Sequence, residues 1–403
     1  MTATLTTVNG ILKEVYEGTV NEQLRNDAVL LKRLERTSDD VFETPGGKYV
    51  VFPLHTKRNA GISYRGENSQ LAAAGRQGYQ QAQETLRYGY GRMKITGQTM
   101  ALANTNTKAF INAMDGEMEG IKRDLTVDQN RIGWGDSTGY TATGGTGVIC
   151  NVTATATSTT VTVDDTKNLQ VGMVIDIVDN SGIPIAAGVA LTILSVPTST
   201  TFTIATTPTV TLTVNHIVRT GNWNLEPYGV SALVSAVGTV HNVNSATAGN
   251  EYWKSIDDGA TTVLTEAVMI KKGDDIKTNG GSDISVVFAS MGVRRTYFNL
   301  MTSLRRYNEP KTWPGGLIGL SFMYGQDLPL IADPAAPAKS MYLLTESELK
   351  IYRDKDWYWE DTDGSVLKYV HDFDVFEALM KQYWQLVTHK RNAHARFTNL
   401  TEA

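Results

Sequence analysis

The sequence has one cysteine, few histidines and no long apolar run. The single Cys150 among 403 residues excludes a disulfide framework and a cysteine-based zinc cluster. No stretch approaches 18 uncharged apolar residues, so we expect no membrane-spanning helix, and the first residues lack the pattern of a signal peptide. Lys and Arg number 37 against 42 Asp and Glu. This balance argues against sequence-specific nucleic-acid binding through clustered basic side chains.

Motifs for common enzyme chemistry are also missing. The sequence contains no GxxxxGK[ST] or GxGxxG phosphate loop. No serine lies in GxSxG, and Cys150 has no histidine close to it in the sequence. The six histidines form no compact ligand set, since His389 and His394 are five residues apart on a predicted strand and so point to opposite faces. We therefore predict no catalytic residue, no cofactor, no metal site and no enzymatic activity.

Threonine is in excess, and the excess is local. Of 50 threonines, 21 lie in residues 141–220, and residues 141–218 contain only five charged side chains. Runs such as TSTTVTV, MVIDIVD and TTFTIA are β-branched and separated by turn residues. Several short strands at this spacing predict an inserted all-β domain, a small barrel or sandwich, over residues 140–220.

Three segments before this block are too extended to bury their own apolar side chains. Residues 1–45 carry a narrow, weakly amphipathic stripe and are predicted to form an arm. Residues 46–98 contain predicted strands at 48–56 and 85–96, joined by a long polar connection of a kind that is usually functional or disordered. Residues 99–139 contain the clearest helix, which has an apolar stripe along one side.

The connection and the helix have opposite charges. Seven basic residues and two acidic residues lie between Lys57 and Lys94, whereas the polar face of the helix is acid-rich. Two interpretations of the connection stay open: a solvated flexible loop, or a basic hairpin that docks on an acidic surface of a neighbouring chain. Pairing with the helix within one chain also stays open. The charged side chains that we expect at a contact between subunits are Lys57, Arg58, Arg65, Arg76, Asp115 and Glu119.

The second half of the chain predicts a mixed α/β region. Helical patterns cover residues 256–277 and 291–307, on either side of a buried strand at 284–289. The acidic pairs Asp257–Asp258 and Asp274–Asp275 are expected to flank the first of these helices.

The last segment is predicted as strand, helix and strand. The strands are expected near residues 366–370 and at 393–397, with a helix from Asp372 to about Lys381. The aromatic side chains of Trp357 and Trp359 could stack on a sugar or base, although such a cluster is more often a core or interface anchor. We include both among the expected contacts between subunits.

The order of these segments resembles the tailed-bacteriophage major capsid protein family, which has the Hong Kong 97-type fold. FETPGGKYVVFPLHTKRNAGISYRGE and LRYGYGRMKITGQTMALA resemble the two limbs of the family's E-loop, and NTKAFINAMDGEMEGIKRDLTVDQNRIGWGD resembles its spine helix. SVVFASMGVRRTYFNLM and GLIGLSFMYGQDLPLIAD resemble the A-domain, and the stretch from MYLLTESELK to NAHARF resembles the closing part of the P-domain. The resemblance covers nearly the whole chain except about residues 141–220.

The resemblance implies an α+β fold with an inserted all-β domain. The implied division is an N-terminal arm 1–45, an E-loop hairpin 46–98, a P-domain spine helix 99–139, the inserted domain 140–220, an A-domain 221–350 and a P-domain closing segment 351–403. The E-loop would lie over the spine helix and P-domain of the adjacent subunit.

The implied function is that of a structural protein of the virion. Assembled in the host cytoplasm, hexamers and pentamers of the chain would form an icosahedral shell around the DNA genome. The implied partners are further copies of the chain, a portal, a separate scaffolding protein and, as an open possibility, a decoration protein; no membrane is involved. The alternative function is a host-surface or glycan-binding β-module protein, which would use the Thr-rich block and the tryptophan pair.

Overall fold

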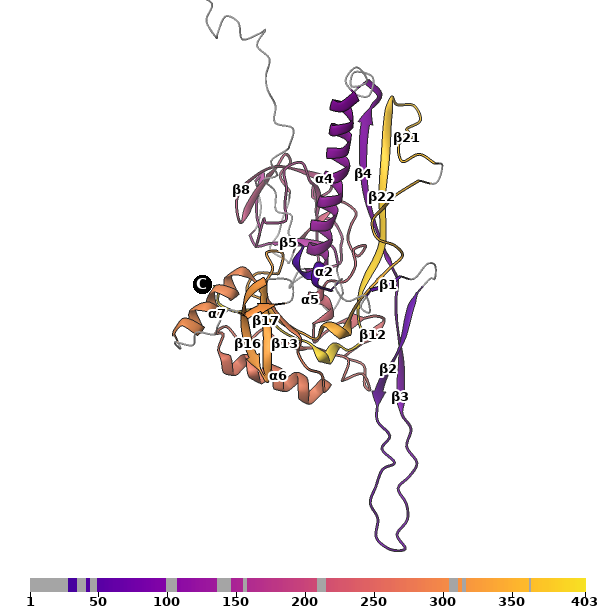
Figure 1. Ribbon diagram of the computed structural model, residues 1–403, viewed down its shortest axis with the longest axis vertical. Helices are drawn as coiled ribbons and strands as arrows, with labels where there is room; N and C mark the ends of the chain where they lie inside the picture. Colours follow the sequence, from indigo (N-terminus) through magenta and orange to yellow (C-terminus); the bar gives the residue numbers. More distant parts are fainter. Residues whose placement is uncertain are drawn as a thin grey trace, which may run out of the picture.

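The computed structural model describes most of the chain and shows an elongated molecule with a body, a long helix and a projecting hairpin (Figure 1). The described residues are 28–34, 41–43, 49–98, 107–135, 146–154, 158–208, 215–303, 311–313, 317–361 and 364–403. The expected N-terminal arm therefore lies largely outside the described residues. Its described parts are helix α2 (Val29–Leu34), which is buried against the body, and strand β1 (Val41–Glu43).

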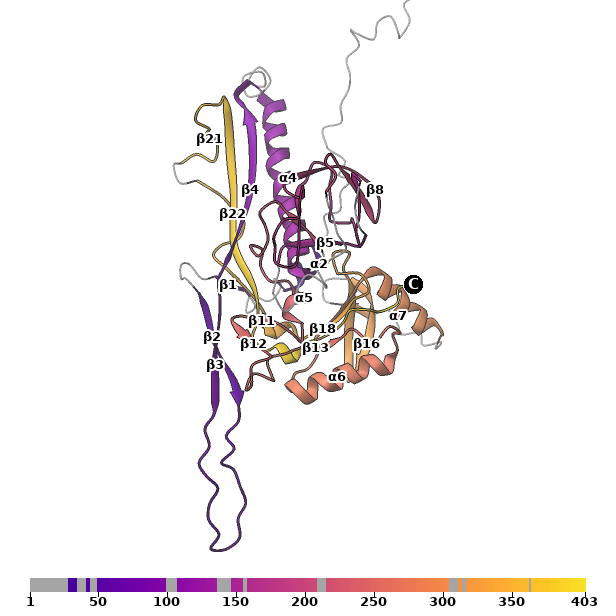
Figure 2. The same cartoon turned by 180° about the vertical axis from the view of Figure 1, so that it is seen from behind.

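A long two-stranded ribbon and a helix run side by side along the molecule (Figures 1 and 2). Strand β22 (Val375–Thr388) pairs antiparallel with β4 (Arg87–Thr96) over ten residue pairs, and its other end pairs with β19 (Leu349–Arg353). Helix α4 (Thr107–Trp134) lies close to β4, because a Cβ atom at Gly91 would be 2.5 Å from Leu125 Cδ1. The predicted long helix is confirmed. The same sheet includes β1, β20 (Tyr358–Trp359) and β21 (Lys368–Tyr369).

A second sheet forms the centre of the body and is covered on both faces. Its strand order is β13 (Ile256–Asp258), β23 (Ala395–Phe397), β18 (Met341–Leu344), β14 (Val286–Ala289), β17 (Gln326–Ala332), β16 (Leu317–Tyr324) and β15 (Lys311–Trp313). On β14, Val287 and Ala289 pack with α6 (Glu266–Gly280) and α7 (Met291–Ser303). Val286 and Phe288 pack on the opposite face with α2, Trp134 of α4 and α5 (Val230–Leu233). Burial on both faces explains the continuous apolar run of this strand.

The Thr-rich block folds as a six-stranded barrel. The strand order is β5 (Val148–Val152), β10 (Asn215–Arg219), β7 (Val174–Val178), β8 (Leu191–Thr198), β9 (Thr201–Ile204) and β6 (Thr160–Thr162). A bridge between Val152 and Val163 joins the first strand to the last and closes the sheet, which covers strand edges that would otherwise pair with other chains. Phe202 and Ile204 face the core while threonines occupy the alternate positions. We refer to residues 148–219 as the Thr-rich barrel.

The hairpin is built differently from the sequence prediction. Strand β2 (Val50–Lys57) pairs with β3 (Gly78–Glu84), which lies inside the predicted polar connection. The predicted second limb at residues 85–96 instead forms β4 and pairs with β22, whose partner residues lie 279 to 297 positions later in the sequence. The prediction of the limb was wrong because β3 is polar, with Ala82 and Glu84 as its buried residues, so it shows no apolar alternation.

The predicted helix from Asp372 to about Lys381 is wrong, because residues 372–374 form a turn and the stretch from Val375 onward belongs to β22. Its apolar residues fit a helical spacing, but Ala378, Met380, Gln382 and Trp384 alternate into the interior at the period of a strand. The polar Gln382 hides this alternation in the sequence. Tertiary pairing with β4 and β19 overrides local propensity.

The predicted helix at 256–277 begins ten residues later than expected. Residues 256–258 form strand β13, parallel to β23, and the helix starts after Thr265, whose side-chain oxygen accepts a hydrogen bond from Val268 N. Asp258 accepts hydrogen bonds from Thr261 in a turn, and Asp274–Asp275 lie inside α6 rather than beside it. Pairing with β23 supplies backbone hydrogen bonds to residues 256–258, so tertiary contacts override the local helical pattern there.

Alanine substitutions at two glycines are expected to change the free energy of unfolding in opposite directions. A Cβ atom at Gly229 would lie 2.6 Å from the backbone oxygen of Trp134, so Gly229→Ala is expected to lower the free energy of unfolding by about 2–3 kcal/mol. Gly120 lies within α4 with open space around its Cα, so Gly120→Ala is expected to raise it by about 0.5–1 kcal/mol. Urea unfolding of the two variants checks both signs, and equal midpoints would contradict the close contact between Gly229 and the end of α4.

Candidate assembly interface

Among the described residues, the hairpin contacts the body at its root. Phe52, Leu54 and Ala82 pack against Trp253 and Val387 in one apolar cluster. The backbone of His241, in the turn between β11 (Thr239–Val240) and β12 (Val243–Asn244), accepts a hydrogen bond from Gln83 N at 3.0 Å. Beyond this root the two strands run away from the body (Figures 1 and 2).

The buried His241 also contacts the hairpin through its side chain. Its Nδ1 lies 3.2 Å from Glu84 Oε2, and its Nε2 accepts a hydrogen bond from Thr388 N at 3.2 Å. Burial lowers the pKa of His241, and the opposing effect of the Glu84 carboxylate is smaller. The root is therefore joined to β22 by a histidine that is neutral near pH 7.

The hairpin tip, residues 58–77, is a surface that no other described part of the chain covers. Ile62 and Leu71 are about four-fifths exposed and Tyr64 is completely exposed. A turn at Gly66 to Ser69, closed by a 3.2 Å hydrogen bond, places these apolar side chains on both limbs of the tip. Large exposed apolar residues on an extended element mark a contact with another molecule.

The predicted basic residues of the hairpin are exposed and face no acidic partner in the described part of the chain. Lys57, Arg58, Arg65 and Arg76 are all exposed, and Arg65 Nε donates a hydrogen bond to Ser63 Oγ. With Glu67 they make four basic residues and one acidic residue between positions 57 and 76, a net charge of +3.

The structure answers whether the basic tip pairs with the acidic helix of the same chain. The tip and the N-terminal half of α4 lie at opposite ends of the molecule, so they do not meet (Figures 1 and 2). Glu119 is exposed and pairs with Arg123 at 2.9 Å, and the side chain of Asp115 lies outside the described residues. Arg92 and Lys94, the basic residues of the predicted second limb in β4, pair with Glu377 of β22.

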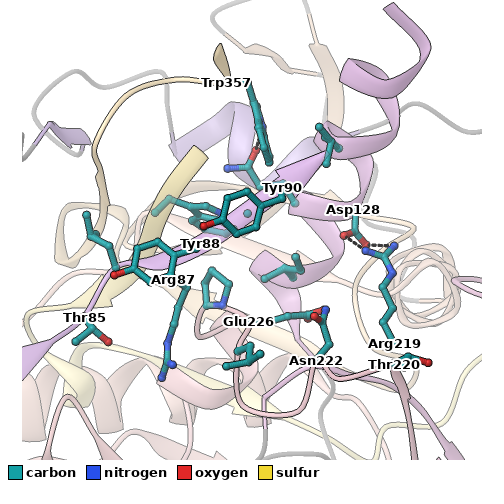
Figure 3. A pocket seen from close by; sticks show the side chains of 18 of the residues that line it. Thr85, Arg87, Tyr88, Tyr90, Asp128, Arg219, Thr220, Asn222, Glu226 and Trp357 are labelled. Atoms are coloured by element: carbon teal, nitrogen blue, oxygen red, sulfur yellow. Dashed lines mark hydrogen bonds and ion pairs between the residues drawn. The ribbon is translucent and has the colours of Figure 1, made fainter. Parts of the chain in front are cut away.

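A cavity of about 790 Å³ opens between the ribbon, α4 and the Thr-rich barrel (Figure 3). We call it the seam groove. Its walls come from β4, from the C-terminal half of α4, from the barrel and from the segment that follows the barrel; the residues used below are Tyr88, Tyr90, Asp128, Gln129, Val174, Arg219, Leu225, Glu226 and Trp357. Tyr88, Tyr90, Val174 and Leu225 are exposed. The groove thus has an aromatic and aliphatic border.

Trp357 forms part of this wall. Its Nε1 donates a hydrogen bond to Gln129 Oε1 at 3.0 Å, and its ring packs over Gly89, where a Cβ atom would lie 3.1 Å from the ring. Trp359 lies in β20 and pairs with Met380 of β22. The tryptophan pair is therefore half-buried against its own ribbon and helix rather than presented as a free stacking platform.

Acidic residues surround Trp357 on the loop that carries it. Residues 354–361 contain four acids and one lysine, a net charge of −3. The Asp356 side chain is 75% exposed, Asp361 is exposed, and Glu360 pairs with Lys381. This border has the charge opposite to that of the hairpin tip.

A charge network joins the barrel to the helix beneath the groove. Arg219 of the barrel donates two hydrogen bonds to Asp128 of α4, at 2.6 and 2.9 Å. Arg131 contacts Asp128 and Glu226, each at 2.8 Å. Burial raises the pKa of Asp128, but the two neighbouring guanidinium groups together lower it by more. The same carboxylates outweigh the desolvation of Arg131 and raise its pKa.

The lowered pKa of Asp128 predicts a defined pH dependence. Asp128→Asn is expected to lower the free energy of unfolding by about 2 kcal/mol at pH 7, the contribution of hydrogen bonds to a charged group. The extra free energy of unfolding of the wild type over Asp128→Asn is fully present above the pKa of an unfolded aspartate, about 3.9. It is lost as the pH falls through the lower pKa of Asp128 in the folded protein. Urea unfolding between pH 7 and pH 3 measures this difference. Glu117→Gln, at an exposed acid on the same helix, is the control; a constant difference down to pH 3 would contradict the network.

Sequence reasoning found the basic residues and the tryptophans but missed Ile62, Tyr64 and Leu71. The available signal was large apolar residues within a polar segment without periodicity. Within the described ranges, no group of three or more His, Cys, Asp or Glu side chains could hold a metal ion. In the same ranges, no helix is long and apolar enough to cross a membrane.

Comparisons with known proteins bear on the fold. No family model and no curated protein sequence matches the chain. Among solved structures, the capsid asymmetric unit of cyanophage A-1(L) is 13% identical, with a TM-score of 0.59, and the match covers 99% of this chain and 100% of that one.

Two further structures are similar over nearly their whole length. The holo-SrpI encapsulin complex from Synechococcus elongatus PCC 7942 is 7% identical with a TM-score of 0.50, covering 99% of this chain and 96% of that one. The capsid of a native GTA particle is 8% identical with a TM-score of 0.50, covering 99% of both chains. The chain therefore has the Hong Kong 97-type fold of tailed-phage major capsid proteins, as the resemblance in the sequence implies.

Proposed function

We propose that the protein is the major capsid protein of a tailed bacteriophage, a structural subunit without enzymatic activity that forms the icosahedral head shell around the DNA genome. The observation that carries this proposal is the likeness of nearly the entire chain to a cyanophage capsid subunit. Two features of the molecule support it independently: the hairpin tip exposes apolar side chains that only a partner would cover, and the protein is elongated rather than globular.

The proposal includes the division of the chain that the sequence predicts. Residues 46–98 would be the E-loop, although its two limbs are β2 and β3, and residues 99–139 with 351–403 would make the P-domain. Residues 221–350 would be the A-domain and 140–220 an inserted domain. Partners of such a shell would be further copies in hexamers and pentamers, a portal, a scaffolding protein and a decoration protein on the finished virion.

Electron microscopy of the purified protein tests the proposal. We expect negatively stained samples of the full chain to contain capsomers, shells or polymers, because the exposed tip gains stability only on contact with another copy. Particles isolated from producing cells are expected to contain nuclease-protected DNA. A homogeneous monomer at high protein concentration, measured by analytical ultracentrifugation, would contradict a shell-forming role.

A further inference from the structure

We propose that His241 is an acid-sensitive latch of the projecting hairpin. In its neutral form the imidazole holds the root of the hairpin against β22, and protonation of the imidazole releases the root. The inference goes beyond the proposed function and does not depend on it. It concerns the direction in which the hairpin projects from a single subunit.

His241 lies in a tight turn that few residue types adopt. Val240 pairs with Val243, so His241 and Asn242 are the two central residues of the turn between β11 and β12. Their φ angles are 52° and 63°, the left-handed region that a two-residue hairpin turn of type I′ requires. Histidine and asparagine are enriched among the non-glycine residues found in this region. The turn brings both the backbone oxygen and the imidazole of His241 into contact with β3.

The hydrogen bonds of the imidazole determine where its proton lies. The His241 side chain is fully buried. Its Nε2 accepts a hydrogen bond from the backbone N–H of Thr388, the last residue of β22, and therefore carries no proton. Its Nδ1, 3.2 Å from Glu84 Oε2, then carries the proton and donates it to that carboxylate. A second proton can be added only at Nε2, where it would face the N–H of Thr388, which is a donor and never an acceptor.

Charged groups approach His241 from the hairpin and from the body. Glu84 of β3 is the neighbouring anion, and Arg391 in the short helix η4 (Arg391–Ala393) is a neighbouring cation. His389 follows β22 and is close enough for the two imidazoles to interact. The aromatic rings packed around His241 are those of Phe52, Tyr228 and Trp253. Burial lowers the pKa of His241, Glu84 raises it by less, and Arg391 lowers it further.

The hairpin can change direction at a short connection. Strand β3 ends at Glu84 and β4 begins at Arg87, so two residues separate the hairpin from the long ribbon. Protonation of His241 removes the acceptor of the Thr388 N–H, whereas the imidazolium keeps its contact with Glu84. The imidazole therefore stays with the hairpin, and its link to β22 is lost.

Acid favours the open root because the open and closed states bind protons differently. In the open root His241 is in water and has the ordinary pKa of about 6.5, whereas its pKa in the closed root is lower. The closed root is therefore favoured above pH 6.5. Below it, the closed root loses about tenfold in its equilibrium per pH unit, until the pH reaches the lower pKa of the closed state.

His389 adds to the same effect. Its ring lies 4.8 Å from that of Phe52 at the root of the hairpin, and its Nε2 lies 3.0 Å from the Tyr352 hydroxyl. Burial lowers the pKa of His389, and Lys350 and His241 lower it further. Opening of the root exposes this second imidazole to water as well.

Hydrogen exchange followed by mass spectrometry tests the latch in the dilute, unassembled full-length chain. Labelling times are adjusted for the intrinsic pH dependence of exchange, and the central strand β14 is the internal reference. Between pH 7.5 and pH 5.5 we expect the protection of β2 and β3 to fall by about tenfold to a hundredfold relative to β14, one factor of ten for each histidine. No particle has to form, so the result is independent of the shell function.

Two substitutions distinguish His241 from an exposed histidine of the hairpin. His241→Asn does not titrate, suits a positive φ and keeps a donor for Glu84, so we expect the pH response to be smaller by about tenfold. His55→Gln, at an exposed position of β2, is the matched control and is expected to keep the full response. A full response in His241→Asn, or equal losses of protection in the root and in β14 of the wild type, would overturn the inference.

Nitrogen-15 NMR of the histidine side chains provides a measurement on the wild-type chain. At pH 7.5 we expect the His241 proton on Nδ1, and we expect His241 to titrate over the pH range in which the root loses its protection. A proton on Nε2 at pH 7.5, or a titration midpoint at or above the ordinary value of about 6.5, would show that the closed root does not hold this imidazole neutral.

Discussion

Replacing residues 58–77 by a two-residue Asn-Gly turn is expected to abolish shell formation and leave the subunit folded. The turn would join Lys57 to Gly78, which are already paired across the two strands, and Asn-Gly suits a two-residue hairpin turn. The root contacts of Phe52, Leu54 and Ala82 remain, because none of them lies in the deleted segment.

The expected effect on assembly is large because every subunit loses the same contact. A hot-spot contact worth about 2 kcal/mol changes pairwise affinity by about 30-fold, and a shell multiplies this loss over all its contacts. We expect particle yield below about a tenth of wild type in negative-stain images, with an unchanged circular dichroism spectrum and melting temperature.

A variant with the same loop length distinguishes the effect of the length of the hairpin from the effect of its side chains. Replacing residues 58–77 by a Gly/Ser sequence of equal length keeps the span and removes Ile62, Tyr64, Leu71 and the arginines. We expect this variant to fail in assembly as well. Normal shells from the short-turn variant would show that the hairpin tip does not hold neighbouring subunits together, and normal shells from the Gly/Ser variant would show that its side chains are not needed.

Asp333→Ala is expected to lower the free energy of unfolding by about 3–5 kcal/mol, the cost of leaving buried donors without their charged partner. Asp333 is 1% exposed and lies just after β17. Its carboxylate accepts hydrogen bonds from Trp134 Nε1 at 2.7 Å, from Ala335 N at 2.8 Å, and from Asn130 Nδ2 and Leu30 N at 3.2 Å each. One side chain thereby joins α2, α4 and the central sheet.

The measurement is urea unfolding of the unassembled subunit, followed by circular dichroism. Asp333→Asn keeps the shape but turns an acceptor into a donor that faces Trp134 and Asn130, so we expect most of the loss to remain. Asp361→Ala, at an exposed aspartate, is the control and should change stability by less than about 0.5 kcal/mol. An Asp333→Ala midpoint equal to that of the control would refute the role of this carboxylate.

Sequence patterns predicted the elements whose burial is local and periodic. The barrel strands alternate apolar residues with threonine, as in β9, and β14 is apolar throughout because both of its faces are covered. The apolar stripe of α4 also predicts a helix correctly. In the barrel strands and in α4 the period of the apolar residues matches the period of the backbone, whereas β14 stands out by its continuous apolar run.

The candidate site was predictable only in part. Arg65 and Arg76 stand out by charge within a polar segment, and Trp357 stands out by residue type. The position of Trp357 at the seam groove does not stand out in the sequence, because the groove is formed by residues from six separate parts of the chain. The nearest neighbours of Tyr88 in β4, for example, include Tyr383 of β22.

The sequence by itself showed that common catalytic motifs are missing, and it predicted the Thr-rich β-domain and the long helix. It also showed that one loop is basic and that the polar face of the helix is acidic. The tertiary structure alone decided that residues 375–388 form a strand, that the hairpin returns through β3, and that the tip points away from its own helix. The physical reason is that pairing between distant strands supplies hydrogen bonds and burial that no local pattern encodes.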